Sequence, residues 1–89
     1  MKLKSGFVVQ KVGNSFLAVA IGERAEQYNA RIRMNSTGAF LWKLLAEGEK
    51  THGELLSAML TEYDVPEDVA KRDILAFESE LRRGGLLDE

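Results

Sequence analysis

The spacing of hydrophobic residues changes its period once along this chain of 89 residues, at Asn35. Before Asn35 the apolar residues alternate or form short β-branched runs, a pattern that predicts strands. After Asn35 they recur every three or four residues, which predicts helices. Strands followed by helices favour an α+β domain in which the helices cover one face of an antiparallel sheet. The length suits a single domain that spans residues 1–89.

Three strands are predicted before Asn35. Residues 7–12 and 16–21 flank Gly13-Asn14, a two-residue turn signal with Gly first, as a type II′ hairpin requires. The stretch 16–21 is apolar on both faces, which predicts the central strand of the sheet. Residues 28–34 alternate and predict a third strand at the sheet's edge. Its two faces would carry Tyr28, Ala30, Ile32 and Met34 on one side and Asn29, Arg31 and Arg33 on the other.

The first two of three predicted helices have recognisable N-terminal caps. Asn35 or Ser36 can cap the first helix, because a short side-chain oxygen accepts a hydrogen bond from an unpaired N–H of the first turn. Thr51 and Glu54 have the spacing of a capping box for the second helix. Both starts therefore have a physical signal in the sequence.

The third helix is predicted to begin near Pro66 and to close at Gly84-Gly85. Tight glycine-containing turns between the helices resemble a helix-turn-helix arrangement. The expected fold is therefore α+β and winged helix-turn-helix-like, with a three-stranded antiparallel sheet followed by three helices. The helical core stripes would be Phe40, Leu41, Leu44 and Leu45; Leu55, Leu56, Met59, Leu60 and Tyr63; and Ala70, Ile74, Phe77 and Leu81.

Side chains that carry out catalysis or bind metals are scarce. The absence of cysteine excludes disulfides, thiol catalysis and thiolate metal sites, and the single histidine, His52, excludes a multi-histidine metal site within one chain. His52 lies beside a predicted helix cap, where we expect a solvated side chain. No nucleophile-elbow or phosphate-binding motif is present. We therefore predict no catalytic residue, no metal and no cofactor, and a small enzyme is a disfavoured hypothesis.

The charge balance disfavours a protein whose main task is to bind nucleic acid. The chain has 12 Lys and Arg against 14 Asp and Glu, a formal net charge of −2. The alternative function, a winged-helix DNA-binding transcriptional regulator, requires a basic recognition helix, whereas acids offset the bases of the third helix. The sequence shows neither a signal peptide nor a run that could span a bilayer, so we expect a cytoplasmic protein with no membrane partner.

The predicted edge strand is the clearest interaction surface. An edge strand carries unpaired N–H and C=O groups, which can accept an extended peptide as an additional strand. Arg31 and Arg33 could instead protect that edge from aggregation, and the pattern alone supports both interpretations. The uncovered face of the sheet, with apolar residues within 16–21, is a candidate homodimer interface.

The chain also carries an ordered set of short motifs: an Asn-x-Thr-Gly opening at 35–38, an apolar residue before Trp42, a Gly-x-x-Thr turn at 48–51, an Asp-hydrophobic pair at Asp73, and a final Gly-Leu. These motifs lie in four segments, residues 34–45, 48–51, 73–77 and 81–87, and together they resemble the PqqD family. PqqD is the small protein of pyrroloquinoline quinone biosynthesis. Its relatives are the peptide-recognition elements of pathways that make ribosomally synthesised, post-translationally modified peptides.

The resemblance implies a winged-helix domain that acts as a non-enzymatic peptide chaperone. Such a protein binds the leader of a precursor peptide and presents the peptide to a modifying enzyme, often a radical S-adenosylmethionine (radical SAM) protein. In the family the leader adds as a strand beside the third strand and lies against the third helix. The sequence does not indicate which peptide pathway this chain would serve.

The resemblance also implies where the peptide would bind. The strand surface would comprise Ala30, Arg31, Ile32, Arg33 and Met34, and the helix surface Arg72, Leu75, Ala76, Ser79 and Arg83. The arginines in both sets would favour an acidic peptide. Leu75 and Ala76 lie off the core stripe, where they would either line a groove or widen the core face. Asn35 and Trp42 match the family motif, but we expect helix capping from Asn35 and core filling from Trp42, whose indole N–H could otherwise meet a partner.

Overall fold

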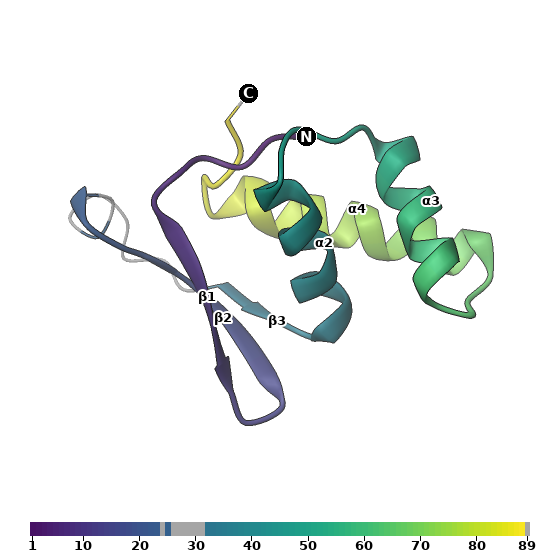
Figure 1. The fold of residues 1–89 in the computed structure, drawn as a ribbon, viewed down its shortest axis with the longest axis horizontal. Coiled ribbons are helices and arrows are strands. Elements are labelled where there is room, and N and C mark those ends of the chain that lie inside the picture. The colour runs from purple at the N-terminus through teal and green to yellow at the C-terminus, as the bar shows by residue number, and fades with distance from the viewer. Residues whose placement is uncertain (24, 26–31, 89) are drawn as a thin grey trace.

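The computed structural model describes residues 1–23, 25 and 32–88. A three-stranded antiparallel sheet comes first and three helices follow (Figure 1), so the predicted α+β fold is confirmed. The elements are β1 (Phe7–Val12), β2 (Ser15–Ala20), β3 (Ile32–Met34), α2 (Ser36–Ala46), α3 (His52–Glu62) and α4 (Glu67–Arg83).

The strands pair in the order β1-β2-β3, so β2 is central and β3 lies at an edge, as the hydrophobic pattern predicts. Val12 pairs with Ser15, which leaves Gly13-Asn14 as the turn. Gly13 has a φ of 61°, and no described residue other than glycine has a positive φ, which fits the predicted type II′ turn. Residues 28–31 of the predicted third strand, with Ala30 and Arg31, lie outside the described residues.

The helix starts follow the predicted capping signals. Asn35 caps α2, because its Oδ1 accepts a hydrogen bond from the Gly38 amide at 2.9 Å. Thr51 and Glu54 form the capping box of α3, and the hydrogen bond from the Thr51 amide lowers the pKa of Glu54. Pro66 is the N-cap of α4. Of the described helices, none has the length and hydrophobicity needed to cross a membrane.

The end of α4 returns the chain to the core. The Leu86 amide donates a hydrogen bond to the Leu81 carbonyl at 2.9 Å. The Gly85 amide donates to the Arg82 carbonyl at 3.1 Å, and Gly85 has a φ of 73°. This is a Schellman motif, and the left-handed conformation explains why a glycine closes the helix. The motif directs Leu86 and Leu87 back into the core, where both are buried.

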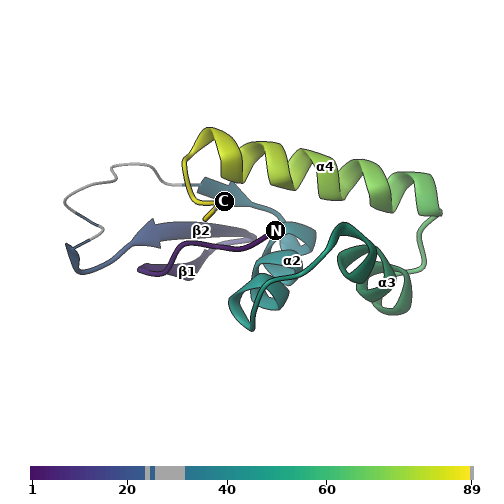
Figure 2. The same ribbon diagram turned by 90° about the horizontal axis from the view of Figure 1, so that it is seen from above.

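The core lies between the inner face of the sheet and the helices, with α4 alongside β3 and α2 (Figure 2). Every residue of the predicted α4 stripe is buried. Trp42 is also buried and meets the Phe7 ring edge-on at a centroid distance of 6.5 Å, which confirms its core role. The prediction for Leu60 is wrong, since it is 38% exposed. It lies about 100° around α3 from the buried Met59 and therefore outside the face that packs on α4.

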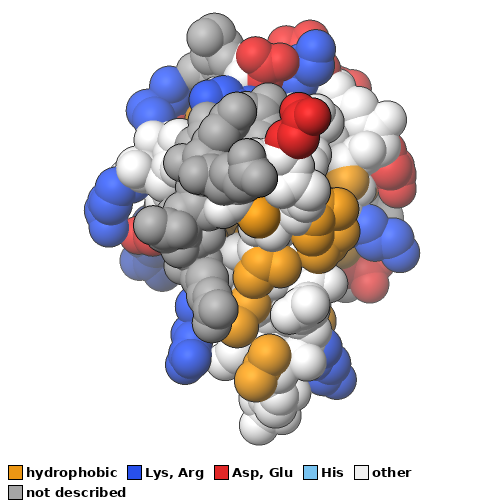
Figure 3. All heavy atoms as spheres, turned by 90° about the vertical axis from the view of Figure 1, so that its left-hand side faces the viewer, with side chains coloured by type: hydrophobic (Ala, Val, Ile, Leu, Met, Phe, Trp, Pro, Cys, Tyr) orange, Lys and Arg blue, Asp and Glu red, His pale blue; other side chains and the backbone are white. Residues whose placement is uncertain are grey.

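Apolar side chains are also exposed on the sheet side of the molecule. Figure 3 shows hydrophobic side chains along this side, with Lys and Arg at its lower margins. Val8 and Val12 of β1, and Ile21 just after β2, are among the large hydrophobic residues that remain exposed. The homodimer interface on the sheet stays a prediction.

The capping box of α3 provides a test of the fold. Thr51→Ala removes the side-chain acceptor for the Glu54 amide, so we expect the free energy of unfolding to fall by about 1 kcal/mol in urea denaturation. Thr61→Ala is the matched control, because Thr61 is an exposed threonine within the same helix and its hydroxyl only donates to the Ser57 carbonyl. Equal losses in the two variants would contradict the capping role.

Candidate functional site

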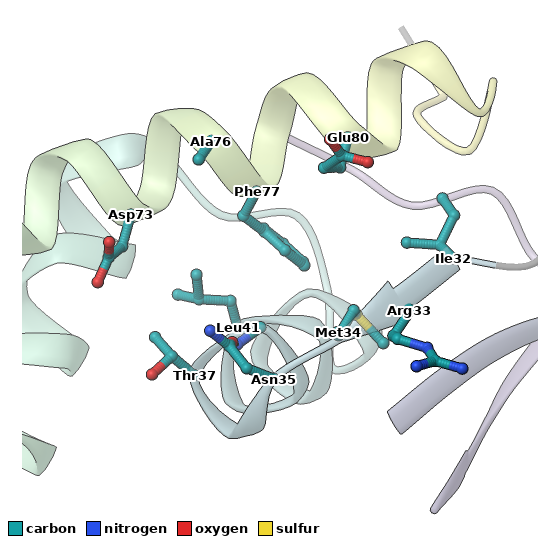
Figure 4. A pocket seen from close by; sticks show the side chains of 11 residues that line it. Ile32, Arg33, Met34, Asn35, Thr37, Leu41, Asp73, Ala76, Phe77 and Glu80 are labelled. Atoms are coloured by element: carbon teal, nitrogen blue, oxygen red, sulfur yellow. The ribbon is translucent and has the colours of Figure 1, made fainter. Parts of the chain in front are cut away.

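A groove of about 200 Å³ lies between β3 and α4 (Figure 4). Its walls come from β3, from the start of α2 and from one flank of α4. The lining residues are Ile32, Arg33, Met34, Asn35, Thr37, Gly38, Leu41, Asp73, Ala76, Phe77 and Glu80.

The base of this groove is apolar. Phe77 extends from α4 toward Leu41 and Met34 in Figure 4, and all three side chains are buried. Alternation along β3 turns Ile32 and Met34 toward the core and Arg33 toward solvent. The residues that close the core between β3 and α4 therefore also form the floor of the groove.

Gly38 allows α2 to start directly beside the end of β3. A Cβ at position 38 would lie 3.1 Å from the Cβ of Met34, which is a tighter contact than side chains normally make. Gly38 is buried, and its amide donates to the Asn35 cap. The Asn-x-Thr-Gly motif thus joins β3 to α2 and shapes one end of the groove.

The hydrogen-bond pattern of the sheet determines which backbone groups of β3 are free. In an antiparallel pair, residues that exchange hydrogen bonds alternate with residues that do not. The Ile21 amide donates to the Gly6 carbonyl at 2.8 Å, which fixes this alternation for β1 and β2. Every second residue of β2 repeats this hydrogen-bonded arrangement, so Val19 and then Leu17 follow Ile21. Leu17 therefore directs its N–H and C=O toward Gln10 of β1.

The residues on either side of Leu17 must direct their N–H and C=O groups toward β3, where their partners are Ile32 and Met34. Arg33, the residue between these two, therefore points its own N–H and C=O away from β2. We call these two backbone groups the outer edge of β3. Within the described part of the chain they are a donor and an acceptor beside the groove, ready for another strand.

Charged residues border the groove on two sides. Asp73 and Glu80 lie on the α4 side, and Arg33 lies on the β3 side, where its side chain points away from α4. Glu80 is exposed and pairs with Arg83 at 3.2 Å. Asp73 is half-buried and has no hydrogen bond or ion pair to any residue that the structure describes. A partly desolvated carboxylate without a partner attracts a cation more strongly than one in open water.

The structure gathers only some of the predicted site residues. Four of them, Ile32, Arg33, Met34 and Ala76, line the groove. Ala76 therefore belongs to a groove wall rather than to a wider core face.

Other predicted site residues lie elsewhere. Leu75 is 60% exposed and lines a separate hollow between α3 and α4, with Leu56 and Ile74 among its neighbours. Three further predicted residues are exposed and do not line the groove: Arg72, Ser79 and Arg83. Ala30 and Arg31 lie outside the described residues.

Sequence reasoning does not identify Asp73, Phe77 and Glu80 as residues of the groove. It assigns Phe77 to the core alone and treats Asp73 as part of a motif without a role. The signal was present, because positions 73, 76, 77 and 80 recur at three- and four-residue spacing and share one flank of a helix. The sequence does not say which flank meets β3.

On the opposite flank, α4 is tied to the start of α3. His52 Nε2 donates to Glu78 Oε1 at 2.9 Å, and Arg82 Nη2 donates to Glu78 Oε2 at 3.1 Å. The His52 side chain is 54% exposed, as expected, but the bond to Glu78 was not foreseen. The hydrogen bond from His52 lowers the pKa of Glu78, and the Arg82 charge and hydrogen bond act in the same direction.

The chemistry of the groove suits the binding of an extended chain. Across residues 1–23, 25 and 32–88, no three His, Cys, Asp or Glu side chains gather as metal ligands would. The groove instead combines an apolar floor with a backbone donor and acceptor at the outer edge of β3. Strand addition uses these two elements, main-chain hydrogen bonds for affinity and side-chain pockets for selectivity.

Comparison with known proteins places these observations in a family. The family model described as "Coenzyme PQQ synthesis protein D (PqqD)" matches residues 19–87. The solved structure "TbiB1 in Complex with the TbiA(beta) Leader Peptide" has a TM-score of 0.75 and 24% identity, over 99% of this chain and 95% of that chain. This similarity shows a common fold. No curated protein matches the chain.

The Glu78 contacts predict a pH-dependent contribution to stability. Glu78→Gln should lower the free energy of unfolding at pH 7 on the order of 1 kcal/mol, because hydrogen bonds to the carboxylate are weakened. Because the pKa of Glu78 is lower in the folded state than in the unfolded state, its carboxylate stabilises the fold at pH values above the unfolded-state pKa. This stabilisation is lost as the pH falls through the folded-state pKa. The difference between variant and wild type should therefore shrink in urea titrations at acid pH.

The control for Glu78 is another glutamate of α4. Glu80→Gln removes a carboxylate that is 54% exposed, against 16% for Glu78, and should change stability less at pH 7. A Glu78→Gln effect that is the same at pH 7 and at acid pH would contradict the electrostatic explanation.

Proposed function

This chain belongs to the PqqD family, and we propose that it is a non-enzymatic peptide chaperone that binds the leader of a ribosomally made precursor peptide. The leader adds as a strand at the outer edge of β3 and packs its inward side chains against α4. The bound peptide is then presented to a modifying enzyme.

One observation carries this proposal: the N–H and C=O of Arg33 point away from the sheet, directly beside an apolar groove. Ile32 and Met34 are paired with β2, so the outer edge of β3 already has a strand conformation before a guest peptide binds. A preorganised edge loses little conformational entropy on binding. The shared fold with TbiB1, whose structure was solved in complex with a leader peptide, supports a peptide-binding role here.

A binding role agrees with the family and with the groove. Proteins of the PqqD family are non-catalytic and bind peptides. The residues that we propose to contact the leader are Ile32, Arg33, Met34, Asp73, Ala76, Phe77 and Glu80. Arg72, Leu75, Ser79 and Arg83 remain predictions for contacts with a leader that extends beyond the groove.

The ion pairs of α4 disfavour the alternative function of a DNA-binding regulator. Lys71 pairs with Glu67, Arg82 with Glu78 and Arg83 with Glu80, each within the helix. Basic side chains that are already paired with acids of the same surface contribute little to phosphate binding.

The pathway is a separate part of the proposal. The modifying enzyme is a radical SAM protein or another peptide-modifying enzyme, as in pyrroloquinoline quinone biosynthesis. A short precursor gene and a modifying-enzyme gene beside the gene for this chain would identify both partners. A synthetic leader from that precursor should then bind the purified chain, and failure to bind would reject that partner.

The outer edge of β3 can be tested with a single residue. Arg33→Pro removes the outward N–H without breaking a bond to β2, so the fold should be retained. Binding of a peptide selected from a displayed random library should weaken about five-fold, the value of one hydrogen bond of about 1 kcal/mol. Isothermal titration calorimetry measures the affinity, and circular dichroism checks the fold.

Arg33→Ala is the matched control, since it removes the same side chain but keeps the N–H. Arg33→Pro should bind more weakly than Arg33→Ala. Ile32→Pro is a poorer test, because the Ile32 amide faces β2 and its side chain is buried. A folded Arg33→Pro variant that binds as well as Arg33→Ala would overturn strand addition at this edge.

A further inference from the structure

Resting on the proposed function, we infer that the groove selects its guest by an alternation of charge. The guest strand carries an apolar residue and a Lys or Arg on the face toward α4, where the cation meets Asp73. On its other face it carries an Asp or Glu beside Arg33. The arginines of the sequence predict an acidic guest. The groove instead favours a guest with charges of both signs, one on each face of the strand.

The alternation follows from the geometry of an added strand. Neighbouring strands of a sheet turn their side chains to the same two faces. Guest residues on the inner face would therefore join Ile32 and Met34 and point toward α4. Residues on the outer face would lie beside the Arg33 side chain, which Figure 4 shows directed away from α4. Directly opposed side chains of opposite charge stabilise such a pair.

Asp73 is the strongest charged determinant on the inner face. It is half-buried in the groove wall and has no partner among the described residues. Glu80 is exposed and already paired with Arg83, so it has less to gain from a guest. A guest cation would supply the partner that Asp73 lacks, in a site where the guest itself excludes water.

The spacing along α4 matches the spacing along a strand. Asp73 and Phe77 are four residues apart, which is about 6 Å along a helix. Successive residues on one face of a strand are about 6.6 Å apart. Because α4 lies alongside β3 (Figures 2 and 4), a guest residue packed on Phe77 places the next inward residue level with Asp73. The cation therefore belongs two positions from the apolar residue.

The experiment selects random 12-residue peptides, displayed on phage, on the purified full chain and on three variants. We expect wild type to enrich peptides with Lys or Arg two positions from an apolar residue. Asp73→Lys should enrich Asp or Glu at that position, and Arg33→Glu should reverse the charge preferred on the alternate positions. Glu62→Lys is the matched control for Asp73→Lys, because both raise the net charge equally but Glu62 lies outside the groove, and it should select the same peptides as wild type.

A selected peptide then gives the quantitative test. Changing its inward Lys to Glu should weaken binding to wild type about five-fold or more, and Asp73→Lys should recover the loss. Asp73→Asn, which is nearly the same size, should remove the preference for the cation while keeping the apolar contact. This second variant decides the matter if Asp73→Lys does not fold by circular dichroism.

The outcomes separate the two proposals. In one outcome, enriched peptides shift the amide signals of residues 32–34 in NMR spectra, but wild type, Asp73→Lys and Arg33→Glu all select the same charges. This result would overturn the charge rule and keep the peptide-binding function. A wild-type chain that enriches no peptide, or only peptides that bind away from β3, would overturn the proposed function.

Discussion

Among the described residues, β3 pairs with β2 on one side and with no strand on the other, and the candidate site depends on this one-sided pairing. The alternation of hydrogen bonds from the β1–β2 hairpin commits the backbone groups of Ile32 and Met34 to β2. The same alternation leaves the N–H and C=O of Arg33 directed outward. An edge of this kind is a liability for aggregation unless a protein covers it or uses it. In the proposed function, the groove beside this edge turns the liability into a peptide-binding site.

The helix α4 serves the core and the groove with adjacent faces. Its stripe of Ala70, Ile74, Phe77 and Leu81 is buried, and the neighbouring flank, with Asp73 and Ala76, borders the groove. Phe77 belongs to both. Because Phe77 is shared in this way, the floor of the groove is part of the packed core.

Much of the fold was predictable because its signals are local. The Gly13-Asn14 turn, the Thr51–Glu54 capping box and the glycines after α4 act over a few residues, and each is found where the sequence predicts it. The sequence predicts part of the candidate groove. Ile32, Arg33, Met34 and Ala76 line it, whereas Leu75 lies in another hollow and Asp73 is not among the predicted contact residues. Membership of the groove depends on how α4 is rotated against β3, which no local signal specifies.

The sequence by itself determined the order of strands and helices, the turn and cap positions, and the apolar faces, because periodicity and backbone chemistry act between near neighbours. Only the tertiary structure decided which amide of β3 points away from β2 and which carboxylates of α4 line the groove beside it. The first depends on the register across two strand pairs, and the second on the packing of a helix against a strand about forty residues away in the chain. Such long-range geometry follows from the summed packing of the core.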